Sequence, residues 1–197
     1  TVTIVGRFDP DQALVAAKRW LEPLKRRSVA NDAARVAPVQ KTGRRAFERM
    51  EVPLGVVLAG WSGPGHADPD SPALSLLSRI LTGGQASRLQ RALTAEPLRC
   101  VLIQGALDDR RDGALLCALA VLRPGTDSAS VERVLVEEVE KLAREPVGEE
   151  ELERVRRQEE VGTLLAWKTV RGRADALGSS QLVKGDWRAA ARRLEQV

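Results

Sequence analysis

The chain has 197 residues, 43% of them hydrophobic, which is enough for one sizeable domain or two small ones with a buried core. Its single histidine and two cysteines cannot build a zinc site from several imidazoles or from four thiolates. A net charge of +4 is weak, and an aromatic content of 3% disfavours proteins that stack single-stranded bases on aromatic rings.

The first 44 residues predict a strand, a helix and a linker. Residues 1–8 are β-branched and apolar, and Asp9-Pro10 is a typical helix start that is followed by apolar residues at helical spacing. Over residues 23–44 the apolar rhythm fails, while Pro, Gly, Asn and basic residues accumulate. We therefore predict a strand and helix over residues 1–22, a linker over 23–44 and a separate domain over 45–197.

The domain over residues 45–197 predicts two pairs of strands that alternate with helices. The strands are expected over residues 45–52, 54–61, 98–107 and 114–122, the last two forming a hairpin around a polar loop. The helices are expected from Asp68-Pro69 to Gly83-Gly84, around Leu89–Leu93, over Val131–Leu142, from Gly148 to about Val170, and less regularly beyond Gly172 and Gly178. Strands paired through tight turns indicate the α+β class, with an antiparallel sheet and helices packed on one face.

The loop over residues 63–68 has two functional interpretations and a structural one. It resembles a dinucleotide-binding loop, but Asp68 stands where the third glycine would be and its carboxylate would repel a phosphate. Residues 60–64, which overlap this loop, also resemble a nucleophile elbow around Ser62, but Pro64 breaks that pattern. His66 could act as a base for Ser62, yet no third group orients it, so a capped turn with an exposed histidine is favoured.

Cys100 and Cys117 lie on neighbouring predicted strands and could pair or remain free. A cation at Arg99 would favour the thiolate of Cys100. A strand cysteine that points into a core behaves as a small hydrophobic residue, which is the favoured interpretation. The acidic run at residues 149–151 fits the start of a helix, and the later arginines fit a solvated face.

Three consecutive segments form a pattern: W-S-G-P-G-H-A-D-P-D at residues 61–70, an apolar helix at 73–81 and G-G-Q-A-S-R-L at 83–89. Together they resemble the C-terminal half of the insulinase/pitrilysin family of inverse-zincin, processing-peptidase-like metallopeptidases. Residues 1–10 are similar to the strand and turn that close the first domain of that family. The resemblance implies that residues 1–22 end a preceding domain. It also implies that residues 45–197 are a C-terminal domain, truncated at its end, with the LuxS/processing-peptidase-like metallohydrolase fold.

The resemblance implies an inactive-type domain of a zinc metalloendopeptidase. The family holds zinc through an H-x-x-E-H helix and a downstream Glu, all in its first half, so we expect no cofactor on this chain and zinc on the parent protein or a partner. The second half encloses the peptide and, in active members, contributes an Arg and a Tyr. Thr94 stands at the position of that Arg and Cys100 at that of the Tyr. Both replacements remove a hydrogen-bond donor of the needed reach.

The resulting candidate substrate-binding set has no catalytic and no metal-binding member; it comprises Arg88, Arg91, Thr94, Arg99 and Cys100. Arg91 or Arg99 could replace the missing Arg. The expected partners are an unfolded polypeptide and a zinc-bearing domain or subunit, as a homo- or heterodimer, in the bacterial periplasm or cytoplasm; no membrane or nucleic-acid partner is expected. The alternatives are a stand-alone protein-binding or scaffold module and, more weakly, a phosphate or nucleic-acid binder that uses the basic linker and the C-terminal arginines.

Overall fold

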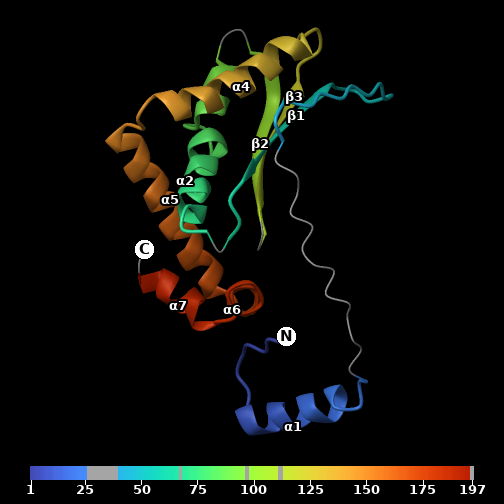
Figure 1. The fold of residues 1–197 in the computed structure, drawn as a ribbon, viewed down its shortest axis with the longest axis vertical. Coiled ribbons are helices and arrows are strands. Elements are labelled where there is room, and N and C mark those ends of the chain that lie inside the picture. Colours follow the sequence, from blue (N-terminus) through green and yellow to red (C-terminus); the bar gives the residue numbers. More distant parts are fainter. Residues whose placement is uncertain (26–39, 67, 96–97, 111–112, 196–197) are drawn as a thin grey trace. The chain divides into compact units, whose positions relative to one another are not determined.

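The computed structural model describes residues 1–25, 40–66, 68–95, 98–110 and 113–195 (Figure 1). The chain divides into two units, one of Thr1–Lys41 with Leu164–Gln196 and the other of Thr42–Thr163. The first break falls in the predicted linker, most of which lies outside the described residues. The stretch from Leu164 onward groups with the first unit and not with the rest of the predicted domain over 45–197.

A three-stranded antiparallel sheet forms the centre of the second unit. Its strands are β1 (Val56–Gly63), β2 (Cys100–Asp109) and β3 (Ala114–Leu122), in the order β1–β3–β2. The predicted hairpin is confirmed, because β2 and β3 pair in register up to Asp109 and Ala114. Since no strand of this sheet runs parallel to its neighbour, the nucleotide-binding interpretation of the loop after β1 loses its structural setting.

The helices of the second unit lie on one face of this sheet (Figure 1). They are α2 (Ser71–Thr82), α3 (Arg88–Thr94), α4 (Ser128–Arg144) and most of α5 (Glu149–Lys168). Along β3, the residues from Ala114 to Leu122 alternate between buried and more exposed positions, as expected of a sheet with one covered face. The core that α2, α3 and α4 bury against the sheet includes Leu81, Leu89, Leu93, Leu116, Val131 and Leu135. The α+β prediction with helices on one face is confirmed.

Two predicted strands are wrong. Residues 1–8 and 45–52 form no strand, and Phe47 and Met50 are 82% and 64% exposed. A strand forms only where a neighbouring strand bonds its backbone N–H and C=O groups, and none of the described residues supplies such a neighbour to either segment. These segments therefore have a strand-like sequence but no neighbouring strand with which to form a sheet.

Two of the predicted helix starts rest on an aspartate, and they differ in outcome. Asp9 caps α1 (Pro10–Leu21) as predicted, since its Oδ1 accepts hydrogen bonds from the backbone N–H groups of Asp11 (2.9 Å) and Gln12 (3.0 Å). Asp68 does not cap α2, which begins later with Asp70 as its N-cap residue. Its carboxylate instead accepts from the N–H of Asp70 at 2.9 Å and orders the turn that leads into the helix.

The C-terminal part of the chain is more helical than the sequence predicts. Gly172 and Gly178 both lie inside α6 (Val170–Lys184), which is followed by α7 (Arg188–Glu195). Gly172 permits the tight passage from α5 to α6, because a Cβ on it would lie 2.0 Å from the carbonyl oxygen of Ala166. This glycine therefore lies in the first turn of a helix, where the sequence suggested an interruption.

Gly105 in β2 marks a close approach between the sheet and α2, and replacing it tests the packing of the covered face. A Cβ at this position would lie 1.9 Å from Oγ1 of Thr82, whose hydroxyl donates to the carbonyl of Ser78 at 2.8 Å. We expect Gly105→Ala to lower the free energy of unfolding by about 1–3 kcal/mol through overpacking, measured by urea denaturation with circular dichroism. Gly43→Ala is the control, since nothing lies within 4 Å of the place that its Cβ would take; equal midpoints for both variants would contradict the packing described.

Candidate substrate-binding surface

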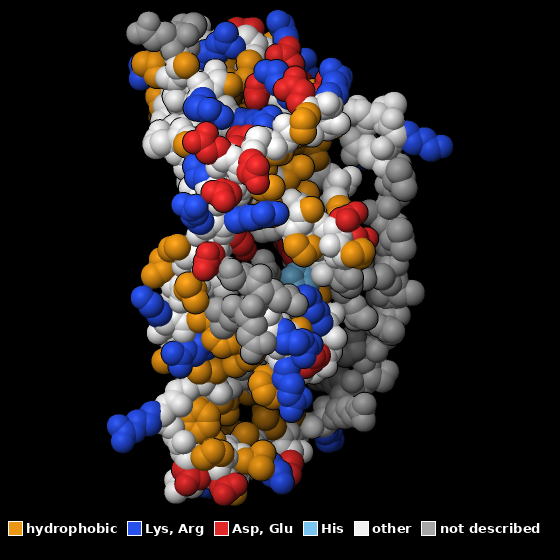
Figure 2. Space-filling view, turned by 90° about the vertical axis from the view of Figure 1, so that its left-hand side faces the viewer, with side chains coloured by type: hydrophobic (Ala, Val, Ile, Leu, Met, Phe, Trp, Pro, Cys, Tyr) orange, Lys and Arg blue, Asp and Glu red, His pale blue; other side chains and the backbone are white. Residues whose placement is uncertain are grey.

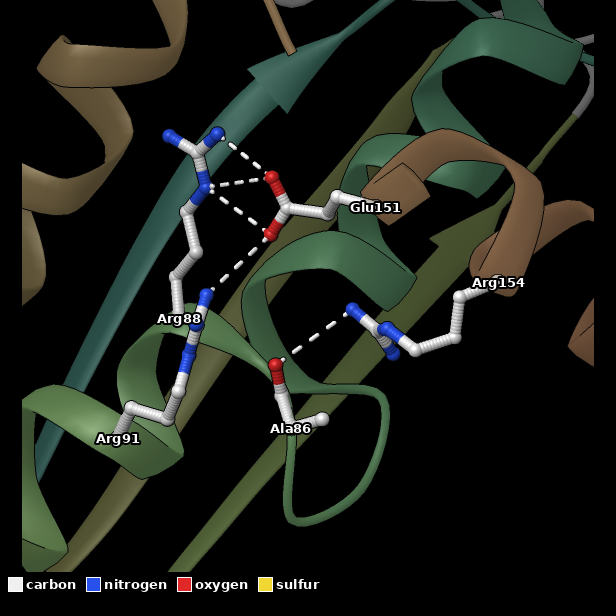
Figure 3. Close-up of polar contacts among 5 residues, drawn as sticks. All are labelled: Ala86, Arg88, Arg91, Glu151 and Arg154. Carbon is white, nitrogen blue, oxygen red and sulfur yellow. Dashed lines mark hydrogen bonds and ion pairs between the residues drawn. The ribbon is translucent and has the colours of Figure 1, made fainter. Parts of the chain in front are cut away.

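The centre of the candidate site is an ion pair between α3 and α5 (Figure 3). Arg88 donates from Nη2 to Oε2 of Glu151 at 2.7 Å and from Nε to both carboxylate oxygens at 3.2 Å. The two side chains are only 14% and 16% exposed. The hydrogen bond from Arg88 holds the pKa of the Glu151 carboxyl below its ordinary value of 4.5, against the opposing effect of burial. The side chain of Arg88 thus links α3 to the first turn of α5.

Arg91 lies one turn after Arg88 and is much less constrained. Its Nη2 is 3.6 Å from Oε1 of Glu151, and its side chain is 64% exposed (Figure 3). A third arginine nearby, Arg154 of α5, reaches the carbonyl oxygen of Ala86 at 3.5 Å in the loop before α3. The carboxylate of Glu151 therefore neutralises Arg88 at close range and leaves the guanidinium of Arg91 largely in solvent.

The other three candidate residues make contacts elsewhere. Thr94 donates from Oγ1 to the carbonyl of Gln90 at 2.6 Å, inside its own helix. The backbone carbonyl of Arg99 accepts from the N–H of Arg123 at 2.9 Å, which joins the start of β2 to the chain after β3. Cys100 is 2% exposed and belongs to the core. The structure therefore brings together only Arg88 and Arg91 of the predicted set.

The cysteines are both free, and they occupy opposite faces of the sheet. Burial raises the pKa of the Cys100 thiol, and the neighbouring Arg99 offsets this only in part, so the thiolate interpretation is wrong and the core interpretation is correct. Cys117 on β3 is partly exposed and lies beside Gly60 and Ala106 on the face opposite α2, α3 and α4. Neighbouring strands thus bring the residues near one another without directing their side chains to the same side.

His66 is not the exposed turn residue that the sequence suggested. Its ring is 21% exposed and its Nδ1 is hydrogen-bonded to Oδ2 of Asp109 at the end of β2. The same oxygen lies 3.4 Å from the hydroxyl of Ser71, and the backbone N–H of His66 donates to the carbonyl of Arg110 at 2.8 Å. The loop after β1 is therefore fastened to the hairpin. The partners are 43 residues apart, so local sequence analysis could not pair them.

A groove of about 630 Å³ runs beside β2, and no pattern in the sequence indicates it. One wall comes from the end of α2 and the loop that follows it, through Thr82, Gly84 and Gln85. The other comes from β2 and from Cys117 and Leu119 of β3. The groove could be found only after the hairpin and the helix end were placed together.

Charges of both signs are mixed on the surface drawn in Figure 2, where Lys and Arg side chains alternate with Asp and Glu. This agrees with the interpretation of the charged runs as solvated helix faces. Among the described residues no group of three or more His, Cys, Asp or Glu side chains is arranged to hold a metal ion. No helix in the described part of the chain is both long and apolar enough to cross a membrane.

Removing either arginine of α3 tests which of them is structural. Arg88→Ala leaves the Glu151 carboxylate poorly solvated and unpaired at short range, and we expect a loss of about 3 kcal/mol in the free energy of unfolding. Arg91→Ala should cost less than about 1 kcal/mol, because its contact is long and exposed. Urea denaturation of both variants at pH 7 measures the difference, and similar losses would contradict the assignment.

Repeating the denaturation of wild type and Arg88→Ala at lower pH provides a control, because it protonates the Glu151 carboxylate. A carboxyl whose folded-state pKa is lowered stabilises the fold above its unfolded-state pKa and loses that contribution as pH falls through the folded-state value. For Glu151 the ordinary value is 4.5. The gap between wild type and Arg88→Ala should therefore be full at pH 7 and shrink below about pH 4.5; a gap that stays constant down to pH 3 would exclude the carboxylate as its source.

The two thiols should differ in reactivity in the native protein. We expect Ellman's reagent to modify Cys117 rapidly and Cys100 only after unfolding, since Cys100 is buried and burial raises its pKa. Cys117→Ser should abolish the fast phase and Cys100→Ser should preserve it. A fast phase that survives in Cys117→Ser would show that the core opens at β2.

Comparison with known proteins identifies the family. Residues 1–159 match the family model described as the peptidase M16 inactive domain. A protease from Helicobacter pylori superposes with a TM-score of 0.77 at 18% identity, over 98% of this chain and 47% of that one. The chain thus spans less than half the length of that relative. None of the curated proteins compared with this chain matches it.

Two Bordetella structures are more similar in sequence. A protein assigned as a zinc protease in Bordetella pertussis Tohama I has a TM-score of 0.62 and 29% identity, over 72% of this chain and 76% of that one. The inactive peptidase domain of a protein assigned as a zinc protease in Bordetella parapertussis has a TM-score of 0.64 and 28% identity, over 72% and 74%. These matches agree with the resemblance found in the sequence, and the chain belongs to the peptidase M16 family, in which it corresponds to the inactive domain.

Proposed function

We propose that this chain is the non-catalytic C-terminal domain of a zinc metalloendopeptidase, and that it helps to enclose an unfolded peptide for a zinc-bearing domain or subunit outside this sequence. The observation that carries the proposal is the match of residues 1–159 to the inactive domain of the M16 family. The Bordetella relatives, assigned as zinc proteases, support the same assignment at 28–29% identity.

The chemistry of peptide hydrolysis supports this division of labour. A catalytic zinc ion needs three protein ligands and an open position for water, and it supplies the activated nucleophile. The single histidine of this chain is already bonded to Asp109 through Nδ1. The metal ion and the water it activates therefore belong to the other domain or subunit, and this chain contributes only contacts to the peptide.

Within this function, Arg91 is the best substrate contact of the predicted set. Its 64% exposure and long contact with Glu151 leave its donors available for a peptide carbonyl or carboxylate. Arg88 is occupied by Glu151, and Cys100 is enclosed in the core, so neither serves as a substrate ligand in this proposal. Arg99 remains a second candidate, since its hydrogen bonds to Leu93, Arg123 and Thr126 use only its backbone N–H and carbonyl.

The partner follows from the same proposal. We expect the chain to act beside a zinc-bearing half of related fold, either in one polypeptide or as a homo- or heterodimer. The Bordetella relatives are bacterial, and we expect the assembled peptidase in a bacterial cytoplasm or periplasm.

The first test uses the isolated 197-residue chain. We expect less than stoichiometric zinc by mass spectrometry and no chelator-sensitive cleavage of fluorescein-labelled casein, because the ligand set is missing. Tight stoichiometric zinc or chelator-sensitive turnover by the chain alone would contradict the proposal. Peptide binding without any peptidase half in the parent organism would favour the stand-alone binding module.

The second test uses the assembled peptidase. Arg91→Ala should raise KM about tenfold with little change in kcat, as expected for the loss of one charge-assisted hydrogen bond to bound peptide. Arg133→Ala on the exposed side of α4 is the matched control and should leave both constants unchanged. Equal effects of the two substitutions would remove Arg91 from the substrate-binding set.

A further inference from the structure

We propose that the first part of α5, residues 149–163, is a strap that detaches from α2 and α3 as one unit, in a salt-dependent way, while the sheet and α4 stay folded. The inference goes beyond the proposed function and does not depend on it. It rests on the small apolar contact of α5, on the ion pairs that attach it, and on buried polar atoms that lack partners where it is attached.

The strap contributes little to the hydrophobic core. Of the described residues of α5, Val155 alone is buried, and it does not belong to the core cluster that joins α2, α3 and α4 to the sheet. By contrast, α3 places Leu89 and Leu93 in that core, and α4 places Val131 and Leu135 there. Tertiary burial of an apolar face supplies most of the stability of a helix in a protein. The strap is therefore attached more weakly than the helices beside it.

Two ion pairs supply much of the attachment. Glu151 is bonded to Arg88 of α3 (Figure 3), and Glu159, eight residues later on the same face of α5, is bonded to Nε of Arg79 of α2. The side chains of Arg79 and Glu159 are 38% and 17% exposed, so dissolved ions reach this pair. Because salt screens the attraction between partly exposed charges, raising the ionic strength favours the detached strap.

Attachment also leaves buried polar atoms without partners. Nη2 of Arg154 reaches the carbonyl oxygen of Ala86 only at 3.5 Å, and its Nη1 is buried with no hydrogen-bond partner among the described residues. The same holds for Oε1 of Gln158, one turn later on α5, and for Oγ of Ser87 in the loop before α3. Buried polar groups that lack partners cost free energy, and water satisfies them once the strap detaches. Desolvation therefore opposes attachment.

Detachment changes both the strap and the surface that it leaves. A helix of 20 residues that has lost its neighbours is only marginally stable in water, so its backbone amides exchange with solvent in the detached state. The carboxylate of Glu151 moves away with the strap. Arg88 and Arg91 of α3 then lose the negative charge that they share in the attached state.

The experiment is native-state hydrogen exchange of the full 197-residue chain, read by mass spectrometry on overlapping peptides from α5, α4 and β3. After correction for intrinsic rates, we expect residues 153–161 to exchange with one common rate that is at least about tenfold faster than that of β3. Raising NaCl from about 0.05 M to about 0.5 M should accelerate α5 about threefold and leave β3 and α4 unchanged. Equal rates in α5 and β3, or a rate in α5 that salt does not change, would overturn the proposal.

A pair of arginine variants tests the ion pairs. Arg79→Gln removes the charge that faces Glu159 and should accelerate exchange in α5 about fivefold, while unchanged exchange in β3 verifies that the variant folds. Arg157→Gln is the matched control on the same helix, because Arg157 pairs with Glu153 in solvent, at 75% and 58% exposure. It should change the rate in α5 less than about twofold. Equal acceleration by the two substitutions would contradict attachment through α2.

A third variant tests the cost of desolvation and predicts a gain of protection. Gln158→Met removes the buried carbonyl that lacks a partner and keeps the length and the helix propensity of the side chain. We expect exchange in α5 to slow about threefold, since attachment no longer removes water from that carbonyl. Exchange that is unchanged or faster in this variant would show that the carbonyl is satisfied in the attached strap, and would overturn this part of the inference.

Discussion

A nearly buried ion pair between Arg88 and Glu151 determines how the candidate surface is arranged. Charges with so little contact with water are stable only when they are paired and hydrogen-bonded, and here three hydrogen bonds meet that need. The pair fixes the start of α5 against α3, and its carboxylate is nearly saturated by one guanidinium. The neighbouring Arg91 consequently meets only a distant oxygen and extends into solvent. A single glutamate thus gives two arginines on adjacent turns very different exposures to solvent.

The rest of the second unit also uses its side chains mainly for packing and for structural hydrogen bonds. Its apolar residues bury one face of the sheet under α2, α3 and α4, and its only histidine links a loop to the hairpin. The side chains of this unit thus serve mainly to hold its fold together. Membership in the M16 family, through its inactive domain, is consistent with that composition.

The parts of the fold that could be predicted from the sequence are those encoded by local patterns. One such pattern is the helical spacing of Leu74, Leu77 and Leu81, followed by the helix end at Gly83. Another is the hairpin between β2 and β3, whose loop ends at Gly113. Both depend on neighbouring residues, and both are found in the structure. The prediction of a strand over residues 45–52 was wrong because alternating side chains indicate that a segment could join a sheet, but not that a partner strand is present. The candidate site was less predictable because it depends on long-range partners. Its position in a motif suggested Cys100 as a substrate-binding residue, but only the packing of β2 shows that its thiol faces the core. The pairing of Arg88 with Glu151 joins residues 63 positions apart, and no local signal separates Arg88 from Arg91.

The open edge of β2 has a consequence for the biogenesis of this protein. A strand edge that is uncovered and has no charged residue in its middle can pair with a strand of another chain. The edge of β2 is therefore one of the places in the described sheet at which aggregation of this domain would begin.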